Sequence, residues 1–351
     1  MRTHLIKPHE LDRQALARWR DLQARNDALA SPYFSPEFTL AVAAVRDDVY
    51  VTLLEDDDRR IAGFFPFQRR WGAGSPAGGR LSDHHGVIAA PGTRWDWNQL
   101  LRGSGLGYWQ FDHLAAYQRP PGQWAHSVSH AMDLAGGYAA WREAKVKARS
   151  ETVLRVERKM RKLEREVGPL RFVANTDDLG VLQTVIRLKL DKCRRTGAIE
   201  YFEWPWTREL VARIQAIDEP GFGGRLSALY AGDTLIAAHF GMRSERVWHT
   251  WFSVYEPDWA SWSPGNMLML RMAEAAAASG HRVMDFGKGD EAYKLALGNG
   301  GLPLVEGCLT RASAATGLRA ARKGTGKLLR ASGMMQPLRS VVQMLGGGRV
   351  L

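Results

Sequence analysis

A short polar segment near residue 290 holds four side chains suited to acid–base chemistry: Asp290, Glu291, Tyr293 and Lys294. A carboxylate can accept a proton from a nucleophile, and a tyrosine or lysine can donate one or stabilise a developing anion. The segment follows an apolar run at residues 282–286, which is typical of a strand. Such side chains act on a substrate only if neighbouring elements bind it, so the preceding elements decide which chemistry is open to them.

The elements that precede this segment predict a place for an anion. Residues 249–255 form a β-rich run, residues 263–266 (Ser-Pro-Gly-Asn) are a helix-start signal, and residues 267–279 are helical in pattern. The free N–H groups and the dipole at such a helix start attract a phosphate or pyrophosphate. We therefore expect strand, helix and second strand, with the polar segment at the end of the second strand.

The composition is that of a globular protein with room for two domains. The chain has 351 residues, of which 45% are apolar, and 13 tryptophans. Cys193 and Cys308 have no CxxC spacing, so the sequence predicts neither a disulfide framework nor a zinc site built on cysteine. The N-terminus lacks an apolar signal core, and no apolar run approaches the ~20 residues of a membrane span. We therefore expect a cytoplasmic protein.

The positive charge of the chain is concentrated at its C-terminus. The formal net charge is +11, and the residues after Gly307 include no acidic side chain but eight basic ones: Arg311, Arg319, Arg322, Lys323, Lys327, Arg330, Arg339 and Arg349. The rest of the chain is only slightly basic, so we expect no nucleic-acid polymer as partner. Apolar residues alternate with these charges, which favours attachment to an anionic membrane surface or an anionic ligand; a disordered extension is the alternative.

Two similar hairpin patterns indicate an internal repeat. Residues 50–54 and 61–66 flank an Asp-rich turn, and residues 225–230 and 236–241 flank an Ala-Gly-Asp turn. The distance from Ile61 to Phe111 equals that from Ile236 to Phe286. We therefore predict a duplicated α/β module. A long charged helix, roughly residues 138–167, lies between the copies and is either a solvated helix with i,i+4 ion pairs or a basic surface for a phosphate-bearing ligand.

Eight short motifs follow one another along the chain: Phe34-Ser-Pro-Glu-Phe38, Phe64-Phe-Pro-Phe67, Leu81-Ser-Asp-His-His-Gly86, Arg158-Lys-Met-Arg-Lys-Leu-Glu-Arg165, Ala238-His-Phe-Gly241, His249-Thr-Trp-Phe252, Ser263-Pro-Gly265 and Asp285-Phe-Gly-Lys-Gly-Asp-Glu-Ala-Tyr-Lys294. Taken in this order, they resemble the GNAT acyltransferase superfamily, in particular the CelD/BcsL-type acetyltransferases of exopolysaccharide synthesis. The two-lobed architecture of these enzymes is shared with the Fem peptidyltransferases. The resemblance covers about residues 15–307.

The resemblance implies a mixed α/β fold of tandem GNAT-like (Fem-like) lobes. Residues 1–137 would form a non-catalytic lobe on the acceptor side, residues 138–307 the acyltransferase lobe, and residues 308–351 a flexible or amphipathic basic tail. The implied activity is transfer of an acetyl or related acyl group from acyl-CoA, with no tightly bound cofactor. The implied acceptor is a small-molecule or lipid-linked amino-sugar of a surface-polysaccharide precursor, at the cytoplasmic face of the membrane.

The resemblance and the residue types together nominate three groups of site residues. The donor-binding residues are Trp251, Ser263, Pro264, Gly265 and Asn266. The catalytic residues are Tyr293 as the acid for the thiolate, Asp290 or Glu291 as the base, Lys294 for the oxyanion or a substrate phosphate, and His239. The acceptor-binding residues are His84, His249, Tyr255, Asp285 and Lys288. The histidines could instead be hydrogen-bonded core residues, the carboxylates helix caps and Lys294 a surface lysine.

Two observations leave other functions open. Many GNAT proteins carry Arg/Gln-x-x-Gly-x-Gly/Ala before the pyrophosphate helix, whereas residues 261–267 here contain one glycine and no basic residue. A Fem-like aminoacyl or peptidyl transferase is therefore an alternative. A non-catalytic regulator that binds a cyclic dinucleotide through Arg161-x-x-x-Arg165 or the tail is another. His84 and His85 are sequence neighbours that would point to opposite faces of a strand, so we predict no metal site there.

Overall fold

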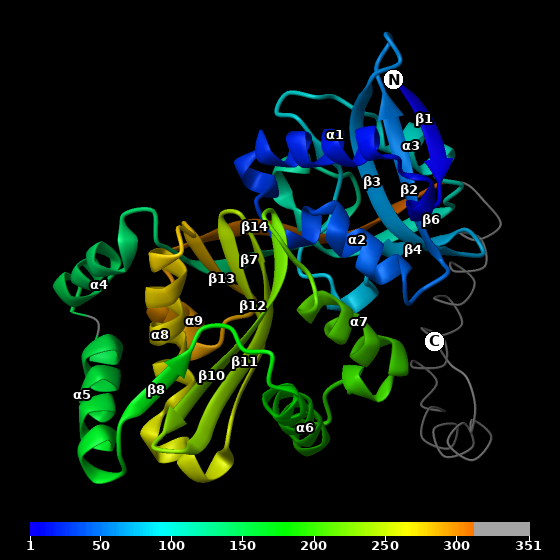
Figure 1. Ribbon diagram of the computed structural model, residues 1–351. Coiled ribbons are helices and arrows are strands. Elements are labelled where there is room, and N and C mark those ends of the chain that lie inside the picture. Colours follow the sequence, from blue (N-terminus) through cyan, green and yellow to red (C-terminus); the bar gives the residue numbers. More distant parts are fainter. Residues whose placement is uncertain (150, 312–351) are drawn as a thin grey trace, which may run out of the picture.

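The computed structural model describes residues 1–149 and 151–311 (Figure 1), so the predictions for the basic tail from residue 312 onward lie outside the described residues. The first lobe contains β1 (Arg2–Ile6), α1 (Arg13–Ala24), α2 (Pro36–Ala43), β2 (Val49–Glu55), β3 (Ile61–Arg70), β4 (Ala73–Pro76), β5 (Ile88–Ala89), α3 (Trp97–Gly103), β6 (Tyr108–Ala115) and β7 (Gln123–Asp133). The second lobe contains α4 (Gly137–Lys147), α5 (Glu151–Glu166), β8 (Leu170–Val173), α6 (Leu179–Thr196), α7 (Pro205–Gln215), β9 (Asp218–Glu219), β10 (Phe222–Ala231), β11 (Thr234–Ser244), β12 (Val247–Tyr255), α8 (Pro264–Ala278), β13 (Val283–Lys288), α9 (Ala292–Leu297) and β14 (Gly300–Thr310).

The predicted repeat and the mixed α/β fold are confirmed. The two predicted hairpins are the antiparallel pairs β2/β3 and β10/β11, and each is followed by a parallel pair, β4/β6 in the first lobe and β12/β13 in the second. All of these strands belong to one sheet, whose order is β1-β2-β3-β4-β6-β14-β7-β13-β12-β11-β10-β8. Five strands of each lobe flank the central pair β14 and β7. Counted inward from the two edges of the sheet, β1, β2, β3, β4 and β6 of the first lobe correspond to β8, β10, β11, β12 and β13 of the second.

The last strand of each lobe is exchanged with the other lobe. β7, which closes the first half of the chain, pairs with β13 of the second lobe, and β14 pairs with β6 of the first lobe. β7 and β14 also pair with each other along most of their length, at the centre of the sheet. Because main-chain hydrogen bonds run across the junction, the two lobes are held in a fixed relation to each other.

Apolar side chains cover both faces of the second-lobe sheet. One core contains Phe240 and Phe252 under α6 and α7, and it also takes in Phe38 of α2 from the first lobe. The other core contains Leu229 and Trp248 under α8 and α5. This two-faced burial explains why strands β10 to β12 read as nearly continuous apolar runs in the sequence.

Two predicted boundaries differ from the structure. The single helix expected over residues 138–167 is two helices, α4 and α5, and Arg149 after α4 has a left-handed φ of 57° that a continuous helix does not permit. The tail was expected to begin at residue 308, yet β14 continues to Thr310 and Leu309 is buried in the first-lobe core. Within the described residues, no helix combines the length and the apolar character that a bilayer span requires.

Candidate active site

The parallel strands β12 and β13 separate at one point in the second lobe. Their pairing register runs from Val247 with Val283 to His249 with Asp285 and ends there, although both strands continue. At the same level β12 carries a bulge against β11, with Trp251 as the extra residue between Thr250 and Phe252. Because the extra residue of a bulge is left out of the ladder, its backbone can bind a ligand placed where the strands diverge.

A buried chain of charged groups occupies this branch point. His249 Nε2 lies 3.0 Å from Asp83 Oδ2, and its Nδ1 lies 3.4 Å from Asp285 Oδ1. Asp285 Oδ1 accepts hydrogen bonds from Ser129 Oγ and from the N–H of Gly287, both at 2.7 Å. His249 and Asp285 are buried, whereas 24% of the Asp83 side chain is exposed. Of these three interacting side chains, Asp83 is therefore the one that a substrate can reach.

The three groups fix one another's charge. Burial alone would lower the pKa of His249, but its interactions with Asp285 and Asp83 raise that pKa to about 9. Burial opposes ionisation of Asp285, yet the His84 and His249 rings and the Ser129 hydroxyl lower the pKa of Asp285 well below its usual value. Burial likewise opposes ionisation of Asp83, and the hydrogen bond to His249 outweighs it, so the pKa of Asp83 is lowered. Both carboxyl groups are thus ionised at neutral pH.

The first lobe contributes half of the site. Asp83 and His84 come from the loop before β5, and Tyr33 comes from the 3₁₀ turn Pro32–Phe34. The Tyr33 ring packs edge-on against three rings, with centroids 5.0 Å from His249, 6.0 Å from His84 and 5.9 Å from Trp251. The site therefore exists only when both lobes are in place.

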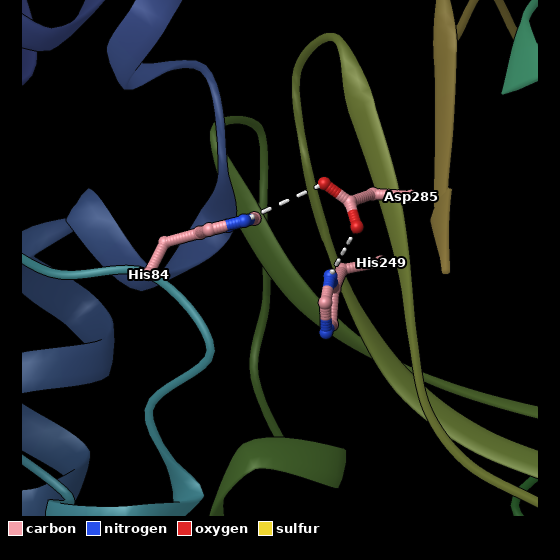
Figure 2. Close-up of side chains that lie close together, drawn as sticks. All are labelled: His84, His249 and Asp285. Atoms are coloured by element: carbon pink, nitrogen blue, oxygen red, sulfur yellow. Dashed lines mark ion pairs between the residues drawn. The ribbon is translucent and has the colours of Figure 1, made fainter. Parts of the chain in front are cut away.

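The two adjacent histidines face different partners. His84 Nδ1 lies 2.7 Å from Ser31 Oγ and its Nε2 faces Asp285, whereas His85 Nε2 accepts hydrogen bonds from the N–H groups of Asp112 and His113. Burial lowers the pKa of His84 to about 4 and that of His85 to about 3. The two rings therefore point toward different partners. His84, however, forms a different group with His249 and Asp285 (Figure 2), in which one ligand-type atom per residue lies within 4.8 Å of the others.

Four of the five predicted donor residues lie at the start of α8, and the fifth, Trp251, is the bulge residue of β12. Pro264, Gly265 and Asn266 form its first turn, and Ser263 at the N-cap has a left-handed φ of 63° and no side-chain capping bond. Lys159 of α5 donates hydrogen bonds to Ser263 Oγ (2.9 Å) and to the carbonyl of Ser261 (2.5 Å). The positive charge that the local motif lacks is therefore supplied by another helix.

The predicted catalytic segment spans the start of α9: Asp290 and Glu291 precede the helix, and Tyr293 and Lys294 lie in its first turn. Tyr293 packs against Phe286 on the face covered by α8, and burial raises the pKa of Tyr293 far above its ordinary value. Lys294 is buried, and its ammonium group donates to the carbonyl of Lys288 (2.6 Å) and pairs with Glu291 (3.1 Å). Asp290 is 88% exposed and lies 3.2 Å from His130 Nε2. The contacts of Lys294 thus hold the turn after β13 in place.

Three other predicted residues do not belong to the buried group of charged side chains at the branch point. His239 of β11 is fully buried, and neither of its ring nitrogens has a hydrogen-bond partner among residues 1–149 and 151–311; burial lowers its pKa to about 3. Tyr255 is 47% exposed and lies beside Gly265. Lys288 forms an ion pair with Glu306 and reaches the carbonyl of Asp112 at 3.4 Å.

A sequence comparison identifies the second lobe. Residues 150–295 match the family described as acetyltransferase (GNAT) domain. This segment is similar to GNAT acetyltransferase domains, and we refer to residues 150–295 as the GNAT-type domain. The matched segment runs from α5 through β12, α8 and β13 into α9, so it contains both strands of the branch point. No curated protein matches the chain by sequence.

Several solved structures share the fold of the two lobes taken together. FemX is 10% identical, with a TM-score of 0.54 over 88% of this chain and 96% of that chain. The C-terminal domain assigned to a lysylphosphatidylglycerol synthetase of Agrobacterium fabrum is 13% identical, with a TM-score of 0.53 over 88% and 95%. A conserved protein of unknown function from Bacteroides thetaiotaomicron is 12% identical, with a TM-score of 0.50 over 84% and 97%. Identities this low establish a common fold.

The basic surface predicted on the inter-lobe helix is balanced by acidic side chains. Arg161 lines a groove of about 320 Å³ between α4, α5 and α8. The groove is also lined by Glu157, Glu164 and Glu274, and Glu157 accepts hydrogen bonds from Arg142. The groove thus has mixed charge, which weakens the case for an anionic ligand there.

The sequence alone did not reveal the site residues whose partners are far away in the sequence. Asp83 stands beside the two histidines that attracted attention, and Lys159 lies in a motif noted for its charge, but nothing local indicates their partners. His249 and Asp83 are separated by 166 positions in the chain, and Lys159 and Ser263 by 104. The Asp83–His249 pair forms across the junction of the lobes, whereas the Lys159–Ser263 pair forms within the second lobe, where α5 packs against α8.

Proposed function

We propose that the protein transfers an acyl group from acyl-CoA to an amine. The observation that carries the proposal is the separation of β12 and β13 beyond His249 and Asp285, with the Trp251 bulge on one side and the start of α8 next in the chain. This arrangement provides an opening for an extended donor, an unpaired backbone segment for its carbonyl and a helix N-terminus for its phosphates.

The donor is proposed to lie along β12. Its pyrophosphate would contact the backbone of residues 263–267 at the start of α8, with Lys159 close enough to neutralise a phosphate oxygen. The thioester carbonyl would accept a hydrogen bond from the backbone near Trp251, which polarises it for attack. The donor would be acetyl-CoA or a related acyl-CoA that binds and leaves in each turnover.

The acceptor is proposed to approach from the first lobe. Asp83 and Asp112 present carboxylates on this side, and the pKa of each is lowered, so a cationic amine is attracted to them. His249, Asp285 and His84 support Asp83 from behind, and the resemblance to CelD/BcsL-type enzymes suggests an amino-sugar of a surface-polysaccharide precursor. Tyr255 and Lys288, which lie at the margins, would contact the more distant parts of the acceptor.

The chemical step requires two proton transfers. The amine nitrogen attacks the thioester carbon, the new C–N bond forms as the C–S bond breaks, the amine loses a proton and the thiolate gains one. Tyr293 remains protonated because burial raises its pKa, and it lies on the α8 side, where the thiolate would leave. Glu291, at the start of α9, is the proposed proton acceptor, with Asp290 as the alternative.

Donor binding can be tested with one glycine in the first turn of α8. A side chain added at Gly265 would lie 3.4 Å from Tyr255 Cδ1, an ordinary contact, so Gly265→Leu should fold. The leucine would occupy the space proposed for the pyrophosphate, and we expect acetyl-CoA affinity measured by calorimetry to fall about tenfold or more, roughly 1.4 kcal/mol. Gly221→Leu is the control, since that position is open on all sides. Equal affinity in the two variants would place the donor elsewhere.

Aminoacyl transfer is the second candidate function. FemX and the lysylphosphatidylglycerol synthetase domain share the two-lobed fold at TM-scores of 0.54 and 0.53, and residues 261–267 lack the glycine pattern of many CoA-binding proteins. The two candidates differ in the donor. Binding of acetyl-CoA with transfer to an amino-sugar favours the first, whereas transfer of an amino acid from charged tRNA, with no affinity for CoA, favours the second.

The basic tail is proposed to attach the enzyme to an anionic membrane surface. Each basic residue near such a surface contributes about 1 kcal/mol, so a few engaged together give salt-sensitive binding. A chain ending at Arg311 keeps β14 intact and should fold and bind donor normally, but it should no longer sediment with phosphatidylglycerol vesicles at low salt. Full-length protein that ignores such vesicles would contradict the attachment. A chain ending at Glu306 would lose buried Leu309 and should be less stable.

A further inference from the structure

Three buried side chains at the lobe junction point their ligand-type atoms at one place. His84 Nε2 lies 3.7 Å from Asp285 Oδ2, and His249 Nδ1 lies 3.4 Å from Asp285 Oδ1, so that each histidine faces one oxygen of the same carboxylate (Figure 2). The exposed fraction of the side chain is 1% for His84, 0% for His249 and 6% for Asp285. Such full burial of charged and polar groups requires that each be paired.

The inner nitrogens of both histidines lack a hydrogen-bond partner. Neither His84 Nε2 nor His249 Nδ1 makes a hydrogen bond within the described residues. A proton on His249 Nδ1 would serve Asp285 but would leave His84 Nε2 unsatisfied, since 3.7 Å is too long for a hydrogen bond to Asp285. One cation placed between the three groups would satisfy both nitrogens and the carboxylate together.

The nitrogens of His84 and His249 that face away from Asp285 have hydrogen-bonding partners, as the non-ligating atoms of metal-binding side chains usually do. His84 Nδ1 lies 2.7 Å from Ser31 Oγ, and His249 Nε2 lies 3.0 Å from Asp83 Oδ2. On binding, the ion displaces the inner proton of His249, so that the outer nitrogens keep their protons and the inner ones offer lone pairs. Asp285 is oriented in turn by Ser129 Oγ and the Gly287 N–H, both on Oδ1, which leaves Oδ2 available.

The donor atoms lie close enough to one another for a small tetrahedral ion to draw them together. Nitrogen and oxygen ligands at about 2.0–2.1 Å from Zn²⁺ lie roughly 3.3–3.4 Å from one another in a tetrahedron. The 3.4 Å separation runs to Asp285 Oδ1 and the 3.7 Å separation to Oδ2. One ligand atom of each residue lies within 4.8 Å of the others, so the three side chains have to approach one another by up to about 1.4 Å when the ion binds. Two imidazoles and one carboxylate suit Zn²⁺ and its first-row neighbours rather than Ca²⁺ or Mg²⁺, which prefer oxygen ligands.

We propose that His84, His249 and Asp285 bind one divalent transition-metal ion, with Zn²⁺ the best fit to the donor set. His84 comes from the first lobe, and His249 and Asp285 come from β12 and β13 of the second, so the ion joins the two lobes at the branch point. Its binding stabilises the two-lobed arrangement by mass action. This proposal does not depend on the identity of the acyl donor.

Metal binding can be measured on the full-length wild-type chain without any substitution. After chelator treatment and dialysis against Zn²⁺, we expect about one equivalent of zinc per chain by mass spectrometry and a higher melting temperature than in the chelated protein. Co²⁺ in place of Zn²⁺ should give the intense visible absorption bands of a four-coordinate site. A chain that retains less than about a tenth of an equivalent, with no such bands, overturns the proposal.

A pair of serine variants separates this site from adventitious binding. Ser31→Ala removes the partner of His84 Nδ1 and should weaken Zn²⁺ affinity about 10- to 100-fold, as is usual when an outer partner is lost. Ser35→Ala is the matched control, because Ser35 is equally buried, lies four positions away and accepts its hydrogen bond from Gln23. Equal Zn²⁺ affinity in the two variants would also overturn the proposal.

Discussion

Replacing Tyr293 with phenylalanine should reduce kcat by about 10²- to 10⁴-fold, the usual cost of losing one general acid. The phenol is proposed to protonate the departing thiolate, and its raised pKa keeps it protonated across the neutral range. The ring itself packs against Phe286, with centroids 5.8 Å apart, and phenylalanine preserves that contact. Acetyl-CoA affinity and the melting temperature should therefore stay close to those of the wild type.

Tyr138→Phe provides the matched control for this experiment. Tyr138 is also partly buried, stacks on Trp141, and has a pKa raised to about 12 chiefly by burial, but it belongs to α4 and not to the segment that follows β13. Steady-state rates with a fixed acceptor should fall only in the Tyr293 variant. Similar rates in both variants, each with normal donor affinity, would remove Tyr293 from the chemical step.

Replacing Asp83 with asparagine should raise the KM for the acceptor roughly 10- to 150-fold, because a hydrogen bond to a charged group contributes about 1.5–3 kcal/mol. Asp83 is the partly exposed end of the buried chain through His249 to Asp285, and asparagine keeps its shape while removing the charge. Donor affinity measured by calorimetry should not change, since the start of α8 is built from other residues. An unchanged acceptor KM would mean that the amine binds elsewhere.

The repeat, its two hairpins and the strand-helix-strand order of the second lobe could be predicted from the sequence because each is a local pattern. The apolar runs of residues 61–66 and 236–241 and the helix start at Ser263 each depend on neighbouring residues alone. The exchange of β7 and β14 has no local signature. β7 and β14 pair with each other and with a strand of the other lobe, and these partners are distant in the sequence, so no pattern of neighbouring residues reveals them.

The same distinction applies to the site. His249, Asp285 and the residues at the start of α8 were nominated because they stand at recognisable places along one segment, and the structure brings His249 and Asp285 together. Asp83, Lys159 and Tyr33 come from the first lobe or from α5, and their roles depend on contacts between distant elements. The role of Lys294 was also hidden, because its partners are backbone carbonyls of the preceding turn.

A crystal structure of the protein soaked with CoA would test the central claim most directly. We predict that the pantetheine arm lies between β12 and β13 beyond His249 and Asp285, with the pyrophosphate on the backbone of residues 263–267 and close to Lys159. The thiol sulfur should then lie near the Tyr293 hydroxyl and the Trp251 backbone. CoA bound at another surface, or no CoA at saturating concentration while the strands remain parted, would contradict the acyl-CoA account.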